Sequence, residues 1–167
     1  MGHNPAAVGN SQPPCFLGYA EGVIDDKLRL TIAAKFKKSL DPERDGSGWV
    51  CVPWPSGHLI LHPEKQFFAM AGQLRNRIAP NEDESELWSA VFGMAERLDM
   101  DASGRVILPK RHLELTGVGS QVVMLGANFC LEIHDKARRE ARQAAVFGQL
   151  PGLVRRIEDK NRSEAGN

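Results

Sequence analysis

Residues 101–109 read Asp101-Ala102-Ser103-Gly104-Arg105-Val106-Ile107-Leu108-Pro109, and this stretch decides the fold. Ser-Gly is a turn dipeptide, and the apolar run that follows it, closed by Pro109, is typical of a short strand. An Asp at the start of a tight turn accepts hydrogen bonds from the backbone just downstream, and Gly104 takes a left-handed backbone angle at little steric cost. Arg105 then leaves the turn as an exposed fork of donors or folds back onto Asp101. The stretch therefore predicts a tight turn that carries a cation into a strand.

The same pattern occurs earlier in the chain. Residues 25–36 read Asp25-Asp26-Lys27-Leu28-Arg29-Leu30-Thr31-Ile32-Ala33-Ala34-Lys35-Phe36. Both copies have Asp-x-x-x-Arg, an apolar strand, a small residue or Pro, and a basic residue, and they align without a gap. Each copy is followed by two apolar runs and then by a segment with helical spacing. In the first half, the apolar runs are residues 49–52 and 59–62 and the helical segment is 63–78. In the second half, the apolar runs are residues 122–125 and 130–134 and the helical segment is 136–147. The pattern indicates an internal duplication of one strand-rich unit.

The length and charge of the chain limit what the two units can be. With 167 residues, the chain is long enough for one domain with a real core, and units this short are expected to share it. The formal net charge is zero, so any basic surface must come from segregation of charge. Such segregation is present, because residues 27–38 are rich in Lys and Arg whereas acidic residues cluster at 82–86.

The cysteines and the hydropathy exclude several classes of protein. Three cysteines are odd in number and share no C-x-x-C spacing, so neither a disulfide framework nor a zinc site built on cysteines is predicted. Cys51 and Cys130 lie in apolar runs and are interpreted as small buried hydrophobic residues. No apolar stretch approaches the roughly 18 residues that cross a bilayer, and the start of the chain has no basic or apolar leader pattern. We therefore expect a cytoplasmic protein without a membrane partner.

The predicted organisation has four segments: a disordered arm over residues 1–16, a first unit plus helix over 17–80, a helix plus second unit and C-terminal helix over 81–147, and a charged, flexible tail over 148–167. Ser85 is the expected N-cap of the helix before the second unit. The aromatic residues of residues 63–95 are expected to pack in the core. Gly148 and Pro151 are expected to end the last helix.

Together with residues 98–101, which lead into the second turn, the two copies resemble the MraZ family of bacterial transcriptional regulators. That family carries two Asp-x-x-x-Arg units of the AbrB-like swapped-hairpin kind, and the resemblance covers residues 17–140. It implies an α+β fold with a mainly β core, a duplicated AbrB-like swapped-hairpin β-barrel formed by the two half-chains, and peripheral helices.

The resemblance also implies a function. It implies a homo-oligomer, in the form of a ring, and sequence-specific binding of double-stranded DNA at direct repeats upstream of division and cell-wall genes, at the nucleoid. It implies no enzymatic activity, and we expect no catalytic residue, cofactor, metal or small-molecule substrate.

Site residues follow from the resemblance position by position. Arg29 and Arg105 match the signature arginines, and Asp25 and Asp101 match the signature aspartates. The expected DNA contacts are Lys27, Arg29 and Arg105, with weaker phosphate contacts from Lys35, Lys37, Lys110 and Arg111. We expect Asp25, Asp101 and Gly104 to shape the turns. The alternative is that the Asp and Arg pairs only lock the crossing of the two hairpins.

The first unit departs from the family pattern at two positions. It has Leu28 where the family has Gly, and Ala33 where the family has Pro, whereas the second unit keeps both Gly104 and Pro109. A Leu adopts positive φ less readily than Gly, so the first turn is expected to differ in shape or to be strained by roughly 1 kcal/mol or more. The departures leave open an alternative function, an oligomeric scaffold or interaction module that has lost DNA binding.

Two further classes of protein fit the sequence less well. His58 and His62 are four residues apart, and with His134 or Cys51 they suggest a metal-dependent enzyme, but the run between them reads as a strand and lacks the Glu of the helical zinc motif. An AbrB-like antitoxin fits poorly, because such proteins usually carry one unit and a long disordered tail.

Overall fold

The computed structural model describes residues 14–74 and 81–165 of the chain. Its contacts divide the chain into two compact units, residues 1–135 and residues 136–167. The described part is α+β, with a core made mainly of β-sheet and with helices at its periphery. This coarse fold class agrees with the sequence-based prediction.

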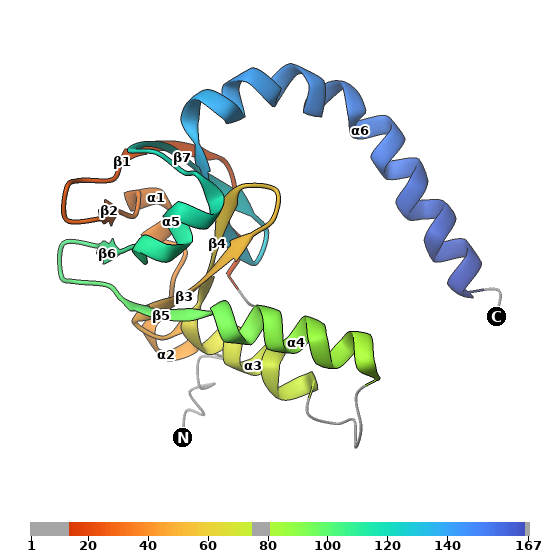
Figure 1. Cartoon of the computed structure of the whole chain (residues 1–167), viewed down its shortest axis with the longest axis horizontal. Coiled ribbons are helices and arrows are strands. Elements are labelled where there is room, and N and C mark those ends of the chain that lie inside the picture. The colour runs from red at the N-terminus through yellow and green to blue at the C-terminus, as the bar shows by residue number, and fades with distance from the viewer. Residues whose placement is uncertain (1–13, 75–80, 166–167) are drawn as a thin grey trace, which may run out of the picture. The chain divides into compact units, whose positions relative to one another are not determined.

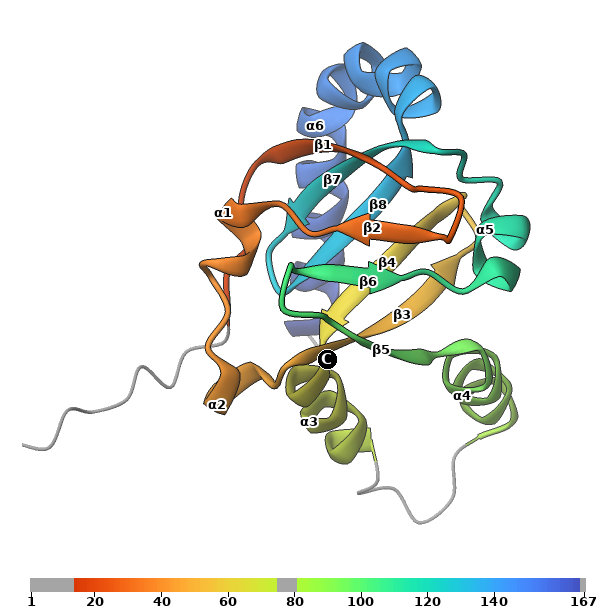
Figure 2. The same cartoon turned by 90° about the vertical axis from the view of Figure 1, so that its left-hand side faces the viewer.

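The larger sheet of the first unit has six antiparallel strands in the order β1-β7-β8-β4-β3-β5 (Figures 1 and 2). Its strands are β1 (Tyr19–Val23), β7 (Gln121–Ala127), β8 (Cys130–Asp135), β4 (His58–Pro63), β3 (Gly48–Trp54) and β5 (Glu96–Asp99). The apolar runs 49–52, 59–62, 122–125 and 130–134 therefore form strands, as predicted.

A second sheet consists of β2 (Arg29–Thr31) and β6 (Arg105–Ile107), which pair antiparallel. Leu30 lies opposite Val106 at its centre, and both side chains are fully buried. The larger sheet is open, with β1 and β5 at its edges, so the strands of the described residues form no closed barrel.

The strand registers repeat between the two halves of the chain. In β3 and β5, Gly48 pairs with Asp99, and the corresponding pair in β7 and β1 is Gln121 with Val23. Each edge strand therefore pairs with a strand from the other half, and β4 and β8 join the halves at the middle of the sheet. The duplication predicted from the sequence is present in the hydrogen-bond pattern.

Both halves contribute to one main hydrophobic core, as expected for units that share it. The largest fully buried side chains of this core are Phe16, Leu30, Ile32, Phe36, Trp49, Leu59, Leu61, Leu108, Met124, Leu131 and Ile133. Phe16 contacts the rings of Phe36 and Trp49, at centroid distances of 6.3 and 5.7 Å. Separating the halves would expose many of these side chains to water. Burial of each large apolar side chain contributes about 1.5–3 kcal/mol to the stability of the fold, so neither half is expected to be stable without the other.

Two helices cover the outer face of β3, namely α3 (Glu64–Leu74) and α4 (Glu82–Met94). Phe67 of α3 packs with Val50 and Val52 in a second, smaller core. The N-cap of α4 is Asn81 rather than Ser85, because the Asn81 side chain accepts from Glu84 N while the Glu84 side chain accepts from Asn81 N. The predicted end of the preceding helix, at residue 78, lies outside the described residues.

The prediction that the aromatic residues of α3 and α4 pack in the core is correct for Phe67 and wrong for Phe68 and Phe92, which are exposed. Only a narrow stripe of each helix faces the sheet, and no residue of α4 is completely buried. An apolar groove of about 340 Å³ remains between them. Its lining residues are Phe67, Phe68, Ala71, Leu74, Trp88 and Phe92.

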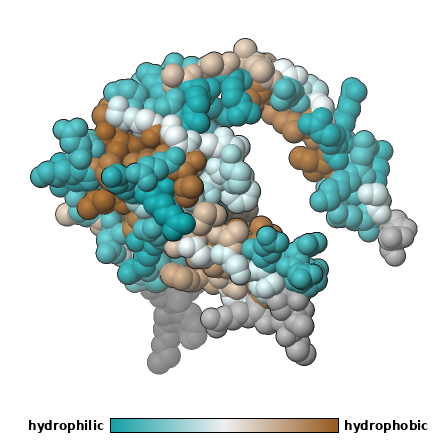
Figure 3. All heavy atoms as spheres, in the orientation of Figure 1, coloured by the Kyte–Doolittle hydropathy of each residue, from teal (hydrophilic) through white to brown (hydrophobic). Residues whose placement is uncertain are grey.

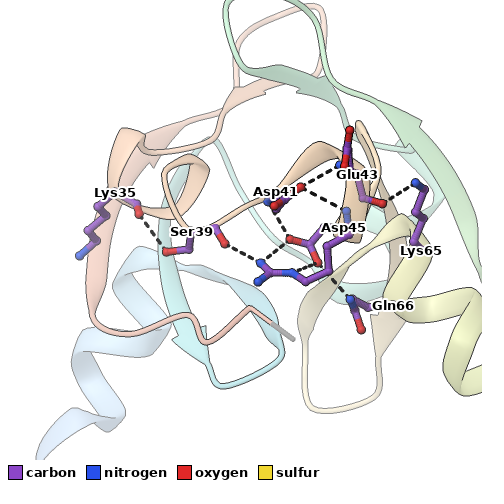
Figure 4. Close-up of polar contacts among 8 residues, drawn as sticks. Lys35, Ser39, Asp41, Glu43, Asp45, Lys65 and Gln66 are labelled. Carbon is purple, nitrogen blue, oxygen red and sulfur yellow. Dashed lines mark hydrogen bonds and ion pairs between the residues drawn. The ribbon is translucent and has the colours of Figure 1, made fainter. Parts of the chain in front are cut away.

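The short helix α2 (Pro42–Asp45) follows α1 (Ala34–Lys37). Asp45 anchors α2 and is fully buried. Its carboxylate accepts two hydrogen bonds from the Arg44 guanidinium, at 2.9 and 2.7 Å, one from Asp41 N and one from Gln66 of α3. Figure 4 shows Asp41 and Gln66 directed toward it. Burial alone would raise the pKa of Asp45, but these hydrogen bonds outweigh burial and the pKa is lowered. The charged cluster fixes the segment between the first turn and β3.

The unit of residues 136–167 is described by the single helix α6 (Lys136–Ala165). The predicted break at Gly148 and Pro151 is absent, because Pro151 lies inside the helix. Pro removes one hydrogen bond and bends a helix, but the strong helix formers on both sides continue it (Figure 1). Exposed apolar residues, such as Phe147 and Ile157, recur along the helix among polar ones (Figure 3). Across residues 14–74 and 81–165, no helix combines the length and apolar character that a membrane crossing requires.

Candidate nucleic-acid interface

Asp25 organises the first turn through both of its carboxylate oxygens. Oδ1 accepts backbone hydrogen bonds from Lys27 and Arg29, each at 2.9 Å, and Oδ2 accepts from Arg29 Nε at 2.7 Å. The backbone bond from Arg29 is the main cause of a lowered pKa for Asp25, so this carboxylate stays ionised at neutral pH. Asp25 therefore closes the turn and holds the guanidinium of Arg29 in one orientation.

The second turn repeats this arrangement. Asp101 Oδ1 accepts from the backbone of Ser103 and Arg105, each at 2.9 Å, and Oδ2 accepts from Arg105 Nε at 2.8 Å. The pKa of Asp101 is lowered mainly by the backbone bond from Arg105. Gly104 has φ +77°. The turn thus has the hydrogen bonds and the left-handed glycine that its sequence predicts.

Leu28 occupies the place of Gly104 in the first turn and has φ +60°. Leu28 N donates to Asp25 O at 2.8 Å, and Gly104 N donates to Asp101 O at 2.9 Å. The two turns therefore have the same shape, and the alternative that the first turn differs in shape is wrong. A Leu in the left-handed region costs roughly 1–2 kcal/mol, so the first turn keeps the geometry at the expense of strain.

The two hairpins cross reciprocally where β2 meets β6. Ile32 N donates to Gly104 O at 2.9 Å, and Leu108 N donates to Leu28 O at 2.8 Å. Because the strands are antiparallel, the two turns lie at opposite ends of this two-stranded ribbon. Both turns project from the same side of the first unit (Figures 1 and 2).

The outer face of the β2–β6 ribbon presents four side chains. Arg29 lies opposite Ile107, and Thr31 lies opposite Arg105, while the residues between them point into the core. The arginine side chains are 34% and 40% exposed, and Ile107 is 61% exposed. Each guanidinium is held through Nε, so its terminal nitrogens remain suited to a two-pronged contact. The alternation in Arg-Leu-Thr and Arg-Val-Ile is the sequence signal that places Thr31 and Ile107 on the surface, although neither belongs to the residues predicted above to contact DNA.

Three further predicted residues lie near the ribbon. Lys27 is exposed on the first turn, and Lys37 Nζ donates to Ser103 O of the second turn at 3.4 Å. Lys35 donates to the Tyr19 carbonyl and lies 5.0 Å from the centre of the Phe36 ring. Lys35 is therefore tied to β1, whereas Lys27 and Lys37 each lie at one turn.

The last two predicted residues, Lys110 and Arg111, are exposed in the first turn of α5 (Lys110–Thr116). Lys110 forms a 3.7 Å ion pair with Glu114 on the same helix. Helices α1 and α5 lie on opposite sides of the ribbon (Figure 2). The basic residues of these helices therefore flank the two arginines.

The metal site considered from the sequence does not form around Cys51. This residue lies in the main core, where its sulfur is 3.4 Å from His112 Nδ1, and burial raises its pKa to about 12. A neutral thiol is a poor metal ligand. His62 packs against Phe67, at a ring distance of 5.7 Å. Of the residues considered for this metal site, His58 and His134 are the two that lie directly opposite each other in the sheet.

Comparison with known proteins points to one family. The family model described as "MraZ protein, putative antitoxin-like" matches residues 91–145. A protein of Delftia acidovorans is 32% identical over 138 residues, which cover 81% of this chain and 94% of that protein. A protein of Bacteroides fragilis strain YCH46 is 30% identical over 126 residues, which cover 75% and 80%. A protein of Coxiella burnetii strain RSA 493 is 26% identical over 137 residues, which cover 81% and 90%. All three carry the name "Transcriptional regulator MraZ".

Proposed function

Since the chain belongs to the MraZ family of transcriptional regulators, we propose that it binds double-stranded DNA through the β2–β6 ribbon and its two turns. The observation that carries this proposal is the matched presentation of Arg29 and Arg105 by two turns with the same hydrogen-bond pattern. The name of the relatives also agrees with the expectation of a regulator rather than an enzyme.

The ribbon has suitable dimensions and chemistry for reading bases. The major groove of B-DNA admits a two-stranded β-ribbon, and an Arg can contact guanine through two hydrogen bonds. Ile107 and the methyl group of Thr31 offer apolar contact to thymine methyl groups. In this arrangement the four outward side chains of the ribbon read sequence.

The surrounding lysines and Arg111 bind phosphates in this proposal. Lys27 and Lys37 lie at the turns, and Lys35, Lys110 and Arg111 lie on the flanking helices. Phosphate contacts position a protein on the duplex without reading sequence, and they make affinity depend steeply on salt. Removing one of these lysines should weaken binding to every sequence alike.

We also propose the finer features that the family resemblance implies. The crossing of β2 and β6 corresponds to an AbrB-like swapped hairpin built from units 17–80 and 81–147, and the chain forms a ring-shaped homo-oligomer. The proposed targets are direct repeats upstream of division and cell-wall genes, which places the protein at the nucleoid in the cytoplasm. A ring supports binding by a chain of zero net charge, because repeated ribbons raise the local density of cations.

The α3–α4 groove is the proposed contact with a second copy. Apolar residues line it, and the helix α4 that supplies two of them also carries Glu82, Asp83 and Glu84 in its first turn. A second copy provides the complementary charge, because the neutral chain balances these acids with exposed basic residues outside the proposed DNA contacts, such as Lys38. Covering the groove would remove apolar surface from water.

The test is a titration of purified protein with the DNA upstream of its own gene, beside a scrambled duplex of equal length, at near-physiological salt. We expect the unmodified protein to bind the native duplex more tightly than the scrambled one. Arg105→Ala should raise the Kd for the native duplex by about 10- to 100-fold. Arg105→Lys keeps the charge but loses the two-pronged contact, so it should lose the preference for the native duplex while retaining salt-dependent binding.

The matched control is Arg97→Ala. Arg97 is also an exposed arginine paired with an acid, Glu64, but it lies on β5 rather than on the ribbon. The Kd of the Arg97→Ala variant for the native duplex should stay unchanged. Circular dichroism should show that all variants are folded. Equal, weak binding of both duplexes by the unmodified protein would overturn the proposal and favour a scaffold without DNA function.

A further inference from the structure

Strands β4 and β8 bring three metal-ligating side chains onto one face of the larger sheet. His58 lies directly opposite His134, and Glu132 is two residues from His134 and therefore on the same face. The two imidazole rings stack with their centroids 4.4 Å apart and their planes 19° apart. All three residues belong to the unit of residues 1–135.

The ligand atoms of these side chains lie close together. Glu132 Oε2 lies 2.7 Å from His134 Nε2, and Glu132 Oε1 lies 3.9 Å from His58 Nε2. One ligand atom from each residue lies within 4.8 Å of the others. Zinc holds nitrogen and oxygen ligands at about 2.0–2.2 Å, so tetrahedral ligands are roughly 3.4 Å apart. Small side-chain rotations would bring the set to that spacing.

His58 is positioned as a ligating histidine usually is. The residue is buried, with 7% of its surface exposed, and its Nδ1 lies 3.1 Å from Ser56 Oγ in the turn between β3 and β4. Histidines that bind metal through Nε2 commonly donate Nδ1–H to a nearby oxygen, which fixes the ring and its tautomer. Ser56 can accept that bond and direct Nε2 toward Glu132.

We propose that His58, Glu132 and His134 bind a divalent transition-metal ion of the zinc class. Two imidazoles and one carboxylate are a ligand set that zinc uses, whereas calcium and magnesium prefer oxygen ligands alone. The ion would connect a strand of the first half to a strand of the second half at the middle of the sheet. Since it would bind the folded state, it would raise stability independently of any DNA contact.

The alternative is that the same three side chains only form a hydrogen-bonded cluster across the strands. Both arrangements stabilise the sheet, so a loss of stability in a variant does not separate them. They differ in metal stoichiometry and in whether added metal raises the melting temperature.

The experiment uses the full chain with His3→Ala as background, because His3 lies outside the described residues and could hold a second ion. The protein is stripped with a chelator, dialysed and titrated with zinc chloride against a chromophoric chelator. We expect about one ion per chain and a rise in Tm on adding zinc. His134→Asn should lower zinc affinity by at least roughly tenfold and remove the rise in Tm.

His62→Asn is the matched control, since His62 lies on the same strand and face as His58 but outside the set. It should leave zinc affinity unchanged. Glu132→Gln tests the carboxylate with a residue of the same shape, and it too should bind zinc more weakly while remaining folded by circular dichroism. Absence of stoichiometric zinc, or equal zinc affinity of the folded Glu132→Gln or His134→Asn variant, would overturn the proposal.

Discussion

Gly104 and Leu28 hold the same left-handed backbone angle in the two turns, although only glycine adopts it at little cost. We predict that Gly104→Ala lowers the free energy of unfolding by about 1–2 kcal/mol. A Cβ at this position would also collide with the end of the Lys37 side chain and displace it from Ser103 O. Urea denaturation monitored by circular dichroism measures the change.

Gly72→Ala is the matched control for that substitution. Gly72 lies in α3, and a Cβ there would meet no atom within 4 Å. Since Ala is a better helix former than Gly, stability should rise by about 0.5–1 kcal/mol. Equal changes in both variants would show that the left-handed angle of Gly104 does not govern the stability of the turn.

The residues of the two candidate sites differ in whether the sequence could predict them. Asp25, Asp101 and both arginines have a motif, because an Asp that caps a turn bonds to residues close in sequence. Glu132 has none, since its position beside His58 depends on a strand register between residues far apart in the chain. The turn chemistry and the candidates His58 and His134 were therefore predictable from the sequence, whereas Glu132 was not.

Helix α4 begins with a capping box at Asn81, four residues before the Ser85 cap that the sequence predicts. We predict that Asn81→Ala lowers the free energy of unfolding by about 1 kcal/mol, because the first backbone N–H groups lose their side-chain acceptor. The effect is measured by thermal or urea unfolding of the full chain.

Ser85→Ala is the control for this prediction, because Ser85 was the cap expected from the sequence. Ser85 N already donates to Asn81 O at 2.9 Å, within the helix. Its substitution should change stability by less than about 0.5 kcal/mol. A larger loss for Ser85→Ala than for Asn81→Ala would contradict the assignment of the cap.

The strands were predictable as elements, whereas the helix ends were not. The runs 49–52 and 130–134 are apolar and bounded by turn residues, which is typical of buried strands. Asn81 follows Pro80, which is typical of a loop after a helix, so the local sequence does not mark Asn81 as the start of the next helix. Gly148 and Pro151 are breakers by local rules, but α6 continues through them because the flanking residues favour helix.

For the first unit as a whole, the duplication was predictable and the exposure of α3 and α4 was not. Two gapless copies of a motif reveal repetition directly in the sequence, and the strand registers reproduce it. A stripe of aromatic residues shows only that a helix has an apolar face, and it does not show what covers that face. Phe68 and Phe92 therefore remain exposed where the sequence predicted core.

The proposed contact with a second copy leads to a prediction at the scale of the assembly. Phe68 lines the α3–α4 groove and is 55% exposed, so Phe68→Ser should weaken self-association while costing the single chain little stability. Leu115→Ser is the control, because Leu115 is equally apolar and 58% exposed but lies on α5. Light scattering after size exclusion should give a smaller mass for Phe68→Ser than for the unmodified protein and Leu115→Ser. If Phe68→Ser keeps the mass of the unmodified assembly, the groove is not the contact between copies.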